Sequence, residues 1–228
     1  MRIAGFQKLT LLDFPGKVAC TLFTPGCDFR CPFCHNASLV LSPGADEVTE
    51  EEIFSFLRKR QGLLEGVAIT GGEPLMQPGL DVFIRKVRAL GYAVKLDTNG
   101  SFPERLAPLL EEGLLDCVAM DIKNSPARYD LATGVKTDLS RIRASVALLI
   151  GGRVPYEFRT TVVKGIHRAE DFPEIGRLIE GAARYFLQSY VDSGDVIDPR
   201  FEAFTKEECA AFLDAVRPFV VSAELRGL

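Results

Sequence analysis

The sequence predicts an α/β protein built on a parallel sheet. Short runs rich in β-branched residues alternate with segments of helical periodicity, an order typical of βαβ units. No internal repeat or low-complexity linker divides the 228 residues. We therefore expect one domain over 1–228, with a core at about 17–190 and a C-terminal extension at about 191–228. Right-handed crossovers leave open a doubly wound sheet or a curved, barrel-like one.

Six segments are predicted to be strands, because each is short, apolar and rich in β-branched or aromatic residues. They span residues 17–24, 66–70, 93–97, 116–121, 156–163 and 185–190.

Helical patterns fill the intervals between these strands. Thr49 and Glu52 form a capping box at the start of a helix over 49–61. A second apolar stripe begins at Leu80 and ends at Gly91, a residue typical of helix C-caps. Further helices are expected at 103–112, 125–132, 140–150 and 171–180. In the tail, a loop at 192–200 precedes a helix capped by Thr205 and Glu208, and an apolar run at 219–225 follows.

Composition excludes several classes of protein. Hydrophobic residues make up 47% and charged residues 25%, which excludes disorder as the main state. No apolar run approaches about 18 residues, so no membrane partner or span is expected. The first residues lack an apolar signal region and a cleavage site, which predicts a cytoplasmic protein. The net charge of −4 argues against nucleic acid as a partner.

Polar residues gather where the predicted strands end. Ligands of both parallel architectures bind at the carboxyl ends of the strands. The residues at these ends are Cys27, Cys31 and Cys34; Gly71, Gly72, Glu73 and Pro74; Asp97, Thr98, Asn99 and Gly100; and Asp121, Ile122 and Lys123, with Arg159 inside the fifth strand. Groups from five strands meeting at one rim indicate a binding site.

Three of the six cysteines, Cys27, Cys31 and Cys34, lie within eight residues. Structural zinc sites and ferredoxin clusters have four protein ligands. His35 could be a fourth ligand here, but because it directly follows Cys34 it would strain a tetrahedral site. Three thiolates suit a four-iron cluster with one iron open to another ligand. Zinc on these cysteines and His35, in a non-catalytic metal-binding module, is the alternative. The other cysteines, Cys20, Cys117 and Cys209, are expected to be buried small hydrophobic residues.

The Gly71-Gly72-Glu73-Pro74 segment follows the second strand. Glycines let a ligand approach the backbone, because no Cβ intrudes. The Glu73 carboxylate suits a ligand ammonium group. By itself this segment would indicate a turn with a solvated glutamate; next to the three cysteines it indicates part of a site.

Together these residues resemble the radical S-adenosylmethionine (radical SAM) superfamily. The matching residues are Cys27, Cys31, Cys34, Phe33 and the Gly71–Pro74 segment. The stretch KLTLLDFPGKVACTLFTPGCDFRCPFCHN resembles activating proteins of glycyl-radical enzymes, and is most similar to the longer subgroup of anaerobic ribonucleoside-triphosphate reductase activating proteins. The DTNG and MDIK motifs and Arg159 also resemble pyruvate formate-lyase activating enzyme. The similarity covers about residues 5–190 and implies a partial (β/α)6 TIM-like barrel with a short C-terminal extension.

The resemblance implies a chemistry carried by two cofactors. Cys27, Cys31 and Cys34 would hold a [4Fe–4S] cluster whose open iron binds S-adenosyl-L-methionine (SAM). An electron from the cluster would split SAM into methionine and a 5′-deoxyadenosyl radical, which removes a hydrogen from a glycine Cα of the partner. The implied partners are a glycyl-radical enzyme, most simply anaerobic ribonucleotide reductase, and a low-potential electron donor such as flavodoxin or ferredoxin.

The same resemblance assigns the SAM-binding residues. Glu73, with the backbone around Gly71 and Gly72, would hold the ammonium group, and Lys123 and Arg159 the carboxylate. Thr98 and Asn99 would contact the ribose, and Phe33 and His35 would pack near the adenine. Asp97 and Asp121 would help to bind a monovalent cation.

The sequence also departs from these relatives. The pyruvate formate-lyase type has a histidine at the end of the sixth strand, where this chain offers Gln188 or Tyr190. The remaining histidine, His167, follows the fifth strand and is expected to face solvent. The alternative enzyme is a radical SAM protein acting on a small molecule, such as a 7-carboxy-7-deazaguanine synthase. A peptide-binding scaffold that uses SAM only structurally is a remote further possibility.

Overall fold

The computed structural model describes residues 1–41 and 48–227 and confirms the α/β class. The order of the strands in the sheet is the same as their order along the chain, from β1 to β8. They are β1 (Gly5–Thr10), β2 (Ala19–Thr24), β3 (Gly66–Gly71), β4 (Ala93–Thr98), β5 (Cys117–Asp121), β6 (Tyr156–Val162), β7 (Tyr185–Ser189) and β8 (Ala223–Arg226). All six predicted strands are present, as β2 to β7. Strands β1 and β8 were not predicted.

Helices occupy the predicted intervals, and one further short helix, α1 (Ala37–Leu41), was not predicted. They are α1 (Ala37–Leu41), α2 (Glu50–Lys59), α3 (Leu80–Ala89), α4 (Pro103–Glu111), α5 (Tyr129–Thr133), α6 (Leu139–Ile150), α7 (Asp171–Leu178) and α8 (Lys206–Val216), with 3₁₀ turns η1 (Pro74–Met76), η2 (Pro126–Arg128) and η3 (Arg217–Phe219). Both predicted capping boxes are formed, at Thr49 before α2 and at Thr205 before α8. Within the described residues, no helix is long and apolar enough to cross a membrane.

The chain divides into two compact units. The first contains Met1–Asp28, Ser38–Thr98 and Glu104–Val118, and the second contains Phe29–Ala37, Asn99–Pro103 and Ala119–Leu228. One boundary falls between Cys27 and Cys31, and another falls inside β5. The expectation of a single domain over the whole chain stays a prediction.

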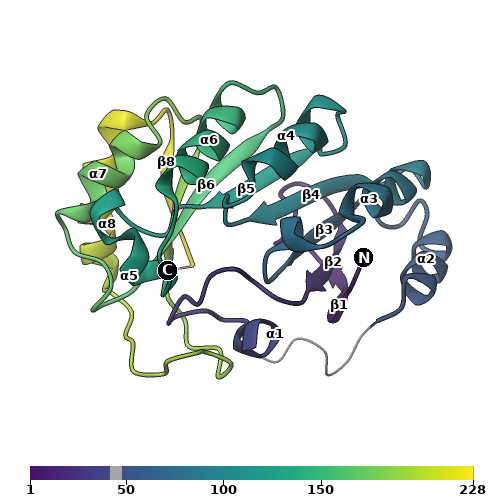
Figure 1. Cartoon of the computed structure of the whole chain (residues 1–228), viewed down its shortest axis with the longest axis horizontal. Helices are drawn as coiled ribbons and strands as arrows, with labels where there is room; N and C mark the ends of the chain where they lie inside the picture. The colour runs from purple at the N-terminus through teal and green to yellow at the C-terminus, as the bar shows by residue number, and fades with distance from the viewer. Residues whose placement is uncertain (42–47, 228) are drawn as a thin grey trace. The chain divides into compact units, whose positions relative to one another are not determined.

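The first unit contains β1 to β4, with α2 and α3 beside them (Figure 1). Strand β1 runs antiparallel to β2, whereas β2, β3 and β4 run parallel. Leu22, Ile69 and Val94 have no exposed surface. Because β3 is apolar on both faces, it reads as a buried parallel strand.

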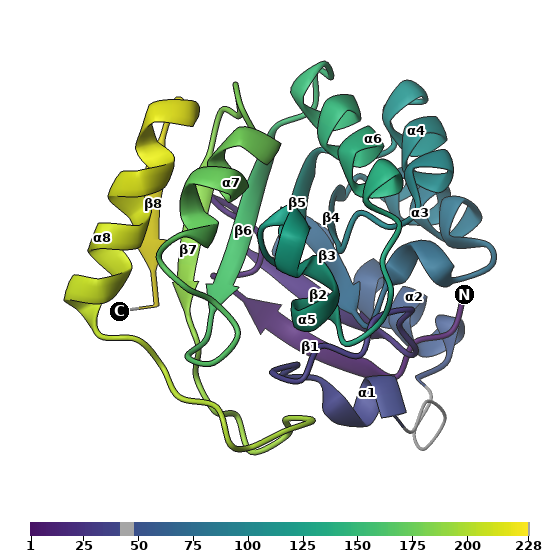
Figure 2. The same ribbon diagram turned by 60° about the vertical axis from the view of Figure 1, so that its left-hand side comes forward.

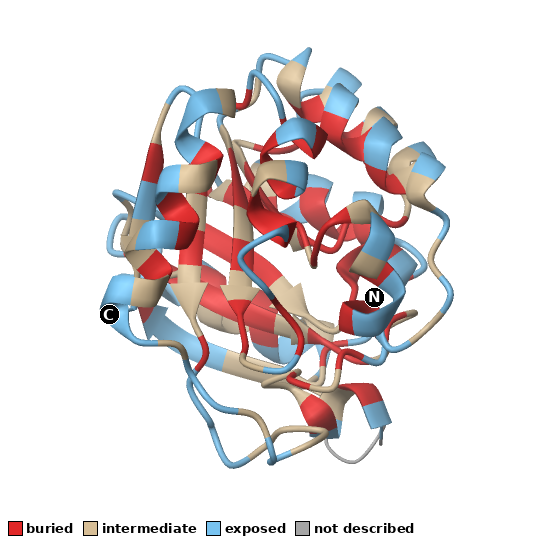
Figure 3. Ribbon diagram, turned by 90° about the vertical axis from the view of Figure 1, so that its left-hand side faces the viewer, coloured by how far each residue is buried: buried red, intermediate tan, exposed pale blue. Residues whose placement is uncertain are grey.

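The second unit contains β6, β7 and β8 as parallel neighbours. Helices α7 and α8 pack together through stacked Phe172 and Phe212, whose ring centroids lie 4.3 Å apart, and α8 lies beside β8 in Figure 2. The guanidinium of Arg226 donates two hydrogen bonds to Glu157, at 2.9 and 3.0 Å, and so ties edge strand β8 to β6. Figure 3 shows buried segments along the strands and helices with one buried and one exposed side.

Candidate functional site

The cysteine loop begins after β2 and ends at α1. Cys27 belongs to the first unit, and Cys31 and Cys34 belong to the second. The Cys34 N–H donates to the Cys31 carbonyl oxygen at 3.0 Å, which closes a tight turn through Pro32 and Phe33. All three thiols are free of disulfides.

These thiols fit the donor chemistry of an iron–sulfur cluster, which takes thiolate ligands. In the described residues, no group of three or more His, Cys, Asp or Glu side chains is arranged around a single metal position. In an iron–sulfur cluster the thiolates bind different iron atoms, so they need not converge on one point. Burial raises the pKa of the Cys31 thiol to about 11, although the positive charge of Lys123 acts to lower this pKa. Ligation of a metal therefore has to displace a proton from this sulfur.

The loop after β7 is hydrogen-bonded to this turn. The Asp198 N–H donates to the Pro32 carbonyl at 2.8 Å, and the Ala37 N–H donates to the Asp195 carbonyl at 3.2 Å. The Ser193 hydroxyl reaches the His35 carbonyl at 3.4 Å. The part of the C-terminal extension predicted as loop thus holds the backbone on both sides of Cys34.

Gly71, the last residue of β3, and Gly72, which follows it, are required by the chain's own packing. Gly72 N–H donates to Thr24 O, and Glu73 N–H donates to Gly26 O, each at 2.8 Å. A Cβ on Gly72 would lie 1.9 Å from the Gly26 oxygen. Gly71 also has a positive φ of 112°. The glycines were expected to let a ligand approach the backbone; in the structure the backbone of Thr24 and Gly26 packs against them.

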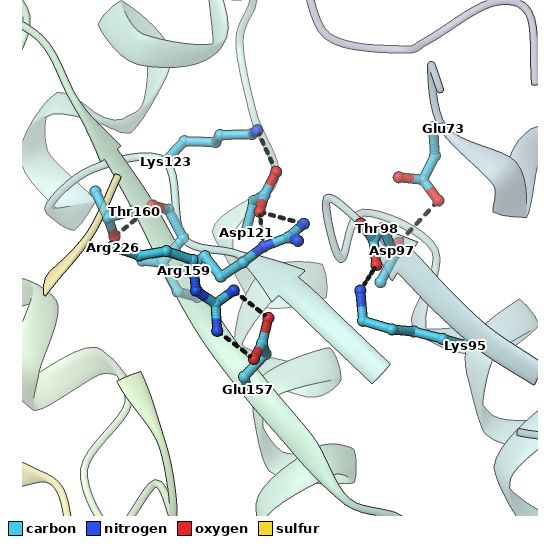
Figure 4. A network of polar contacts seen from close by, with 11 residues as sticks. Glu73, Lys95, Asp97, Thr98, Asp121, Lys123, Glu157, Arg159, Thr160 and Arg226 are labelled. Carbon is cyan, nitrogen blue, oxygen red and sulfur yellow. Dashed lines mark hydrogen bonds and ion pairs between the residues drawn. The ribbon is translucent and has the colours of Figure 1, made fainter. Parts of the chain in front are cut away.

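Glu73 is fully buried, so the alternative of a solvated glutamate is wrong. Its Oε1 accepts hydrogen bonds from Leu75 N–H at 3.0 Å and from the Thr98 hydroxyl at 2.8 Å (Figure 4). The carboxylate thereby caps η1. Thr98, predicted as a ribose contact, orients Glu73 in this unit.

Asp97 forms an ion pair with Lys95, which is 1% exposed. Lys95 was not among the predicted site residues. The sequence signal for it was a lysine between apolar Val94 and Leu96, two residues before Asp97 in the same strand. Asn99, in the second unit, accepts a hydrogen bond from its neighbour Ser101 N–H at 2.9 Å, which fixes the turn after β4.

Asp121, Lys123 and Arg159 form one charged cluster in the second unit, which we call the Asp121 cluster. Lys123 Nζ lies 2.9 Å from Oδ2 of Asp121, and Arg159 lies 2.9 Å from Oδ1 (Figure 4). Burial alone would raise the pKa of Asp121, but Arg159 and Lys123 outweigh it and hold the pKa well below its usual range. Burial alone would lower the pKa of Lys123, but Asp121 outweighs it and raises the pKa. With two cations and one carboxylate, the cluster keeps an excess positive charge that suits an anionic ligand.

Aromatic side chains flank the cysteine turn. The His35 and Tyr190 rings lie 5.5 Å apart. The Tyr190 hydroxyl is buried and has no hydrogen-bond partner among the described residues. Gln188 and Tyr190 were the two candidates to replace the histidine that related enzymes have at the end of the sixth predicted strand, which is β7 here. Tyr190 lies against His35, whereas Gln188 pairs in register with Arg226 on β8. Burial, followed by the charge of Lys123, lowers the pKa of His35.

His167 is buried, with 3% of its surface exposed, so the expectation of a solvent-facing side chain is wrong. The residues after β6 fold back into a tight turn, in which His167 N–H donates to the Val163 carbonyl at 3.0 Å. This turn directs the ring inward. Cys20 and Cys209 are buried as expected, and Cys117 is half-buried.

We predict that Gly72→Ala destabilises the protein by about 1–3 kcal/mol, because the new methyl group meets a backbone oxygen that cannot move aside alone. Chemical denaturation of both proteins measures this loss. Gly151→Ala is the matched control: its φ of −78° suits any residue, and the site at the end of α6 is exposed. Equal stability of the two variants would contradict the close packing of Gly72 against Gly26.

A second prediction concerns the loop after β7. Asp198→Pro removes the N–H that binds Pro32 and should raise the reactivity of the buried Cys31 thiol toward an alkylating reagent, measured by mass spectrometry of the labelled peptide. Asp198→Ala keeps the N–H and loses the ion pair with exposed Arg200 and the hydrogen bond from the Arg200 N–H to the Asp198 carboxylate. Its Cys31 should therefore react like that of the unmodified protein. Equal reactivity in both variants would show that the hydrogen bond does not protect the turn.

Comparisons with known proteins identify the family of this chain. The sequence profile of the radical SAM superfamily matches residues 21–179. A provisionally named glycyl-radical enzyme activating enzyme from Methanocaldococcus jannaschii is 30% identical over 208 residues, covering 88% of this chain and 84% of that protein. A 7-carboxy-7-deazaguanine synthase from Methanopyrus kandleri is 29% identical over 182 residues, covering 68% of this chain and 71% of that protein.

A solved structure supports the fold independently. The structure of TYW1 with a lysine–pyruvate adduct bound has a TM-score of 0.62 and 16% identity, covering 88% of this chain and 73% of that one. The likeness shows a shared α/β fold. The profile match covers the cysteine motif, the Gly71–Pro74 segment and the Asp121 cluster. This chain is therefore a radical SAM enzyme homologous to glycyl-radical enzyme activating enzymes, and it belongs to the radical SAM superfamily.

Proposed function

We propose that this enzyme activates a glycyl-radical enzyme, and that its partner is anaerobic ribonucleoside-triphosphate reductase. The observation that carries the proposal is the similarity to an activating enzyme over 88% of this chain and 84% of that protein. The KLTLLDFPGK stretch ahead of the cysteines supports the choice of the reductase. A cytoplasmic setting with flavodoxin or ferredoxin as electron donor completes the proposal.

Cys27, Cys31 and Cys34 are the proposed ligands of a [4Fe–4S] cluster. When bound, such a cluster supplies the electron that splits SAM and leaves a 5′-deoxyadenosyl radical. The turn closed between Cys34 N–H and the Cys31 carbonyl supports this role by fixing the spacing of two of the sulfurs. The loop after β7, bonded to Pro32 and Ala37, supports it by holding the turn.

The charged side chains are of the kinds that the two ends of the methionyl group of SAM require. Lys123 and Arg159 provide N–H donors with an excess positive charge for the carboxylate. Glu73 provides a buried carboxylate for the ammonium group. Because Asp121 Oδ1 and Oδ2 accept hydrogen bonds from Arg159 and Lys123, we assign Asp121 to orienting these cations rather than to binding a metal cation.

The remaining assignments concern the nucleoside part of SAM. We propose that Asn99 contacts the ribose and that Thr98 holds Glu73 in position, as its hydrogen bond to Oε1 supports. Phe33 and His35 would pack near the adenine. The contact between the His35 and Tyr190 rings, whose planes are tilted by 31°, supports an aromatic surface at this place.

A second candidate function is a reaction on a small molecule. The similarity to a 7-carboxy-7-deazaguanine synthase over 68% of this chain favours it. It would need the same cluster and SAM-binding residues, but no protein partner. The two functions therefore differ in what the radical attacks, and an experiment on the partner separates them.

We predict that the reconstituted enzyme, mixed anaerobically with SAM, a low-potential reductant and anaerobic ribonucleotide reductase, produces a glycyl-radical doublet in the electron paramagnetic resonance (EPR) spectrum of the reductase. The doublet should disappear when SAM or either protein is omitted, because each is needed for hydrogen abstraction. If SAM is cleaved and no doublet forms, the reductase is not the partner. The small-molecule reaction, or another glycyl-radical enzyme, then becomes the better candidate.

A further inference from the structure

His167 is the one histidine that the proposed site does not use, and it lies inside the second unit. The Val163 N–H donates to its Nδ1 at 3.1 Å, and its Nε2 lies 2.9 Å from the Lys123 carbonyl oxygen. Both ring nitrogens are therefore engaged with backbone groups of two different loops, one after β6 and one after β5.

These partners fix the tautomer of the ring. Nδ1 faces an N–H donor, so it must present its lone pair, and in the neutral ring the hydrogen then resides on Nε2. A carbonyl oxygen can only accept, and Nε2–H is the donor that it needs. Burial lowers the pKa of His167, which keeps the ring in this neutral form.

The residues on either side of Lys123 are also fixed by hydrogen bonds, to β6 and to the turn that follows it. Ile122 N–H donates to the Arg159 carbonyl at 2.7 Å, and the Thr160 hydroxyl donates to the Ile122 carbonyl at 2.8 Å. On the other side, the Asn124 side-chain amide donates to the Ile166 carbonyl at 3.2 Å. His167 supplies the bond at Lys123 itself, between these two anchors.

The ring also contacts the cysteine turn. Its centroid lies 6.1 Å from that of Phe33, with the planes at 64°, and 6.3 Å from that of Phe172 on α7. Phe33 is the residue between Pro32 and Cys34. His167 thus joins three parts of the unit: the cysteine turn, the segment after β5 and helix α7.

We propose that His167 is a positioning residue that fixes the Lys123 backbone, so that the Lys123 ammonium group stays paired with Asp121 and aimed at the carboxylate of SAM. This inference deepens the proposed function and rests on it. His167 acts through Lys123 and not on the substrate, because both of its nitrogens are occupied by backbone groups.

Two variants separate hydrogen bonding from packing. His167→Gln keeps one acceptor and one donor at about the reach of the ring nitrogens but loses the ring. His167→Phe keeps an aromatic ring against Phe33 and Phe172 but leaves Val163 N–H and the Lys123 carbonyl without their partner. The test measures SAM binding to the reconstituted enzyme by equilibrium dialysis, together with iron content and thermal unfolding.

We expect His167→Phe to weaken SAM binding by about tenfold, the size of effect expected when one hydrogen bond between charged groups, here from Lys123 to the SAM carboxylate, is weakened. His167→Gln should stay within about threefold of the unmodified enzyme, and iron content should be unchanged in both. A double-mutant cycle with Lys123→Met gives the decisive result. If His167 acts through Lys123, adding His167→Phe to Lys123→Met should weaken binding no further.

Three results would overturn the inference. Unchanged SAM binding by His167→Phe, or an undiminished further loss in the Lys123→Met background, would show that His167 does not act through Lys123. Binding by His167→Gln as weak as that by His167→Phe would show that hydrogen bonding at this place does not explain the role of His167. These results leave the proposed function intact, whereas an unmodified, cluster-loaded enzyme that binds no SAM would overturn both.

Discussion

The pairing of one carboxylate, Asp121, with two cations, Lys123 and Arg159, is the constraint on which the second unit depends. Removing charges from water is costly, and this arrangement compensates the cost with direct hydrogen bonds at 2.9 Å. The side chains are still 14–31% exposed, so the cluster is accessible to a ligand. Loss of one partner in a buried cluster typically costs about 3–5 kcal/mol, and this partial exposure reduces the cost.

The hydrogen bonds around this cluster explain why it is rigid. Strand β6 binds Ile122, the turn after β6 binds Lys123 through His167, and Asn124 binds back to that turn. A side chain whose backbone is fixed on both sides loses little further entropy when it binds a ligand. Preorganisation of this kind is what a site needs to position a reactive molecule.

The first unit reaches a fixed geometry by a different route. Here the backbone itself is packed tightly: the Gly72 and Gly26 segments touch where any side chain would collide. Glu73 is then held by η1 and by Thr98, so its carboxylate has a defined direction. The direction of the Glu73 carboxylate is thus fixed by hydrogen bonds within a tightly packed backbone, and the directions of Lys123 and Arg159 are fixed by hydrogen bonds to Asp121.

Much of the fold could be predicted from the sequence. Periodicity located β2 to β7, and the Thr49 and Thr205 capping boxes located the starts of two helices. The missed elements are α1, with five residues, β8, with four, and the antiparallel edge strand β1. Segments this short, or this exposed, show no complete period, so pattern analysis has nothing to detect.

The site was less predictable, for reasons that particular residues make clear. The cysteine spacing and the Gly71–Pro74 segment were recognisable because their chemistry is unusual. His167 was misplaced because the orientation of a loop residue depends on bonds to distant backbone groups, here Val163 and Lys123, that no local pattern encodes. Lys95 was overlooked because its partner, Asp97, was assigned to a cation instead.

The most direct test of the account is SAM cleavage by the enzyme alone. The protein is reconstituted anaerobically with iron and sulfide and reduced, and 5′-deoxyadenosine formed from SAM is quantified for the unmodified chain, Cys31→Ala and Cys117→Ala. The account predicts that the unmodified chain and Cys117→Ala cleave SAM, and that Cys31→Ala does not, because it lacks one cluster ligand. Cleavage at an undiminished rate by Cys31→Ala, or no cleavage by the cluster-loaded unmodified chain, would contradict it.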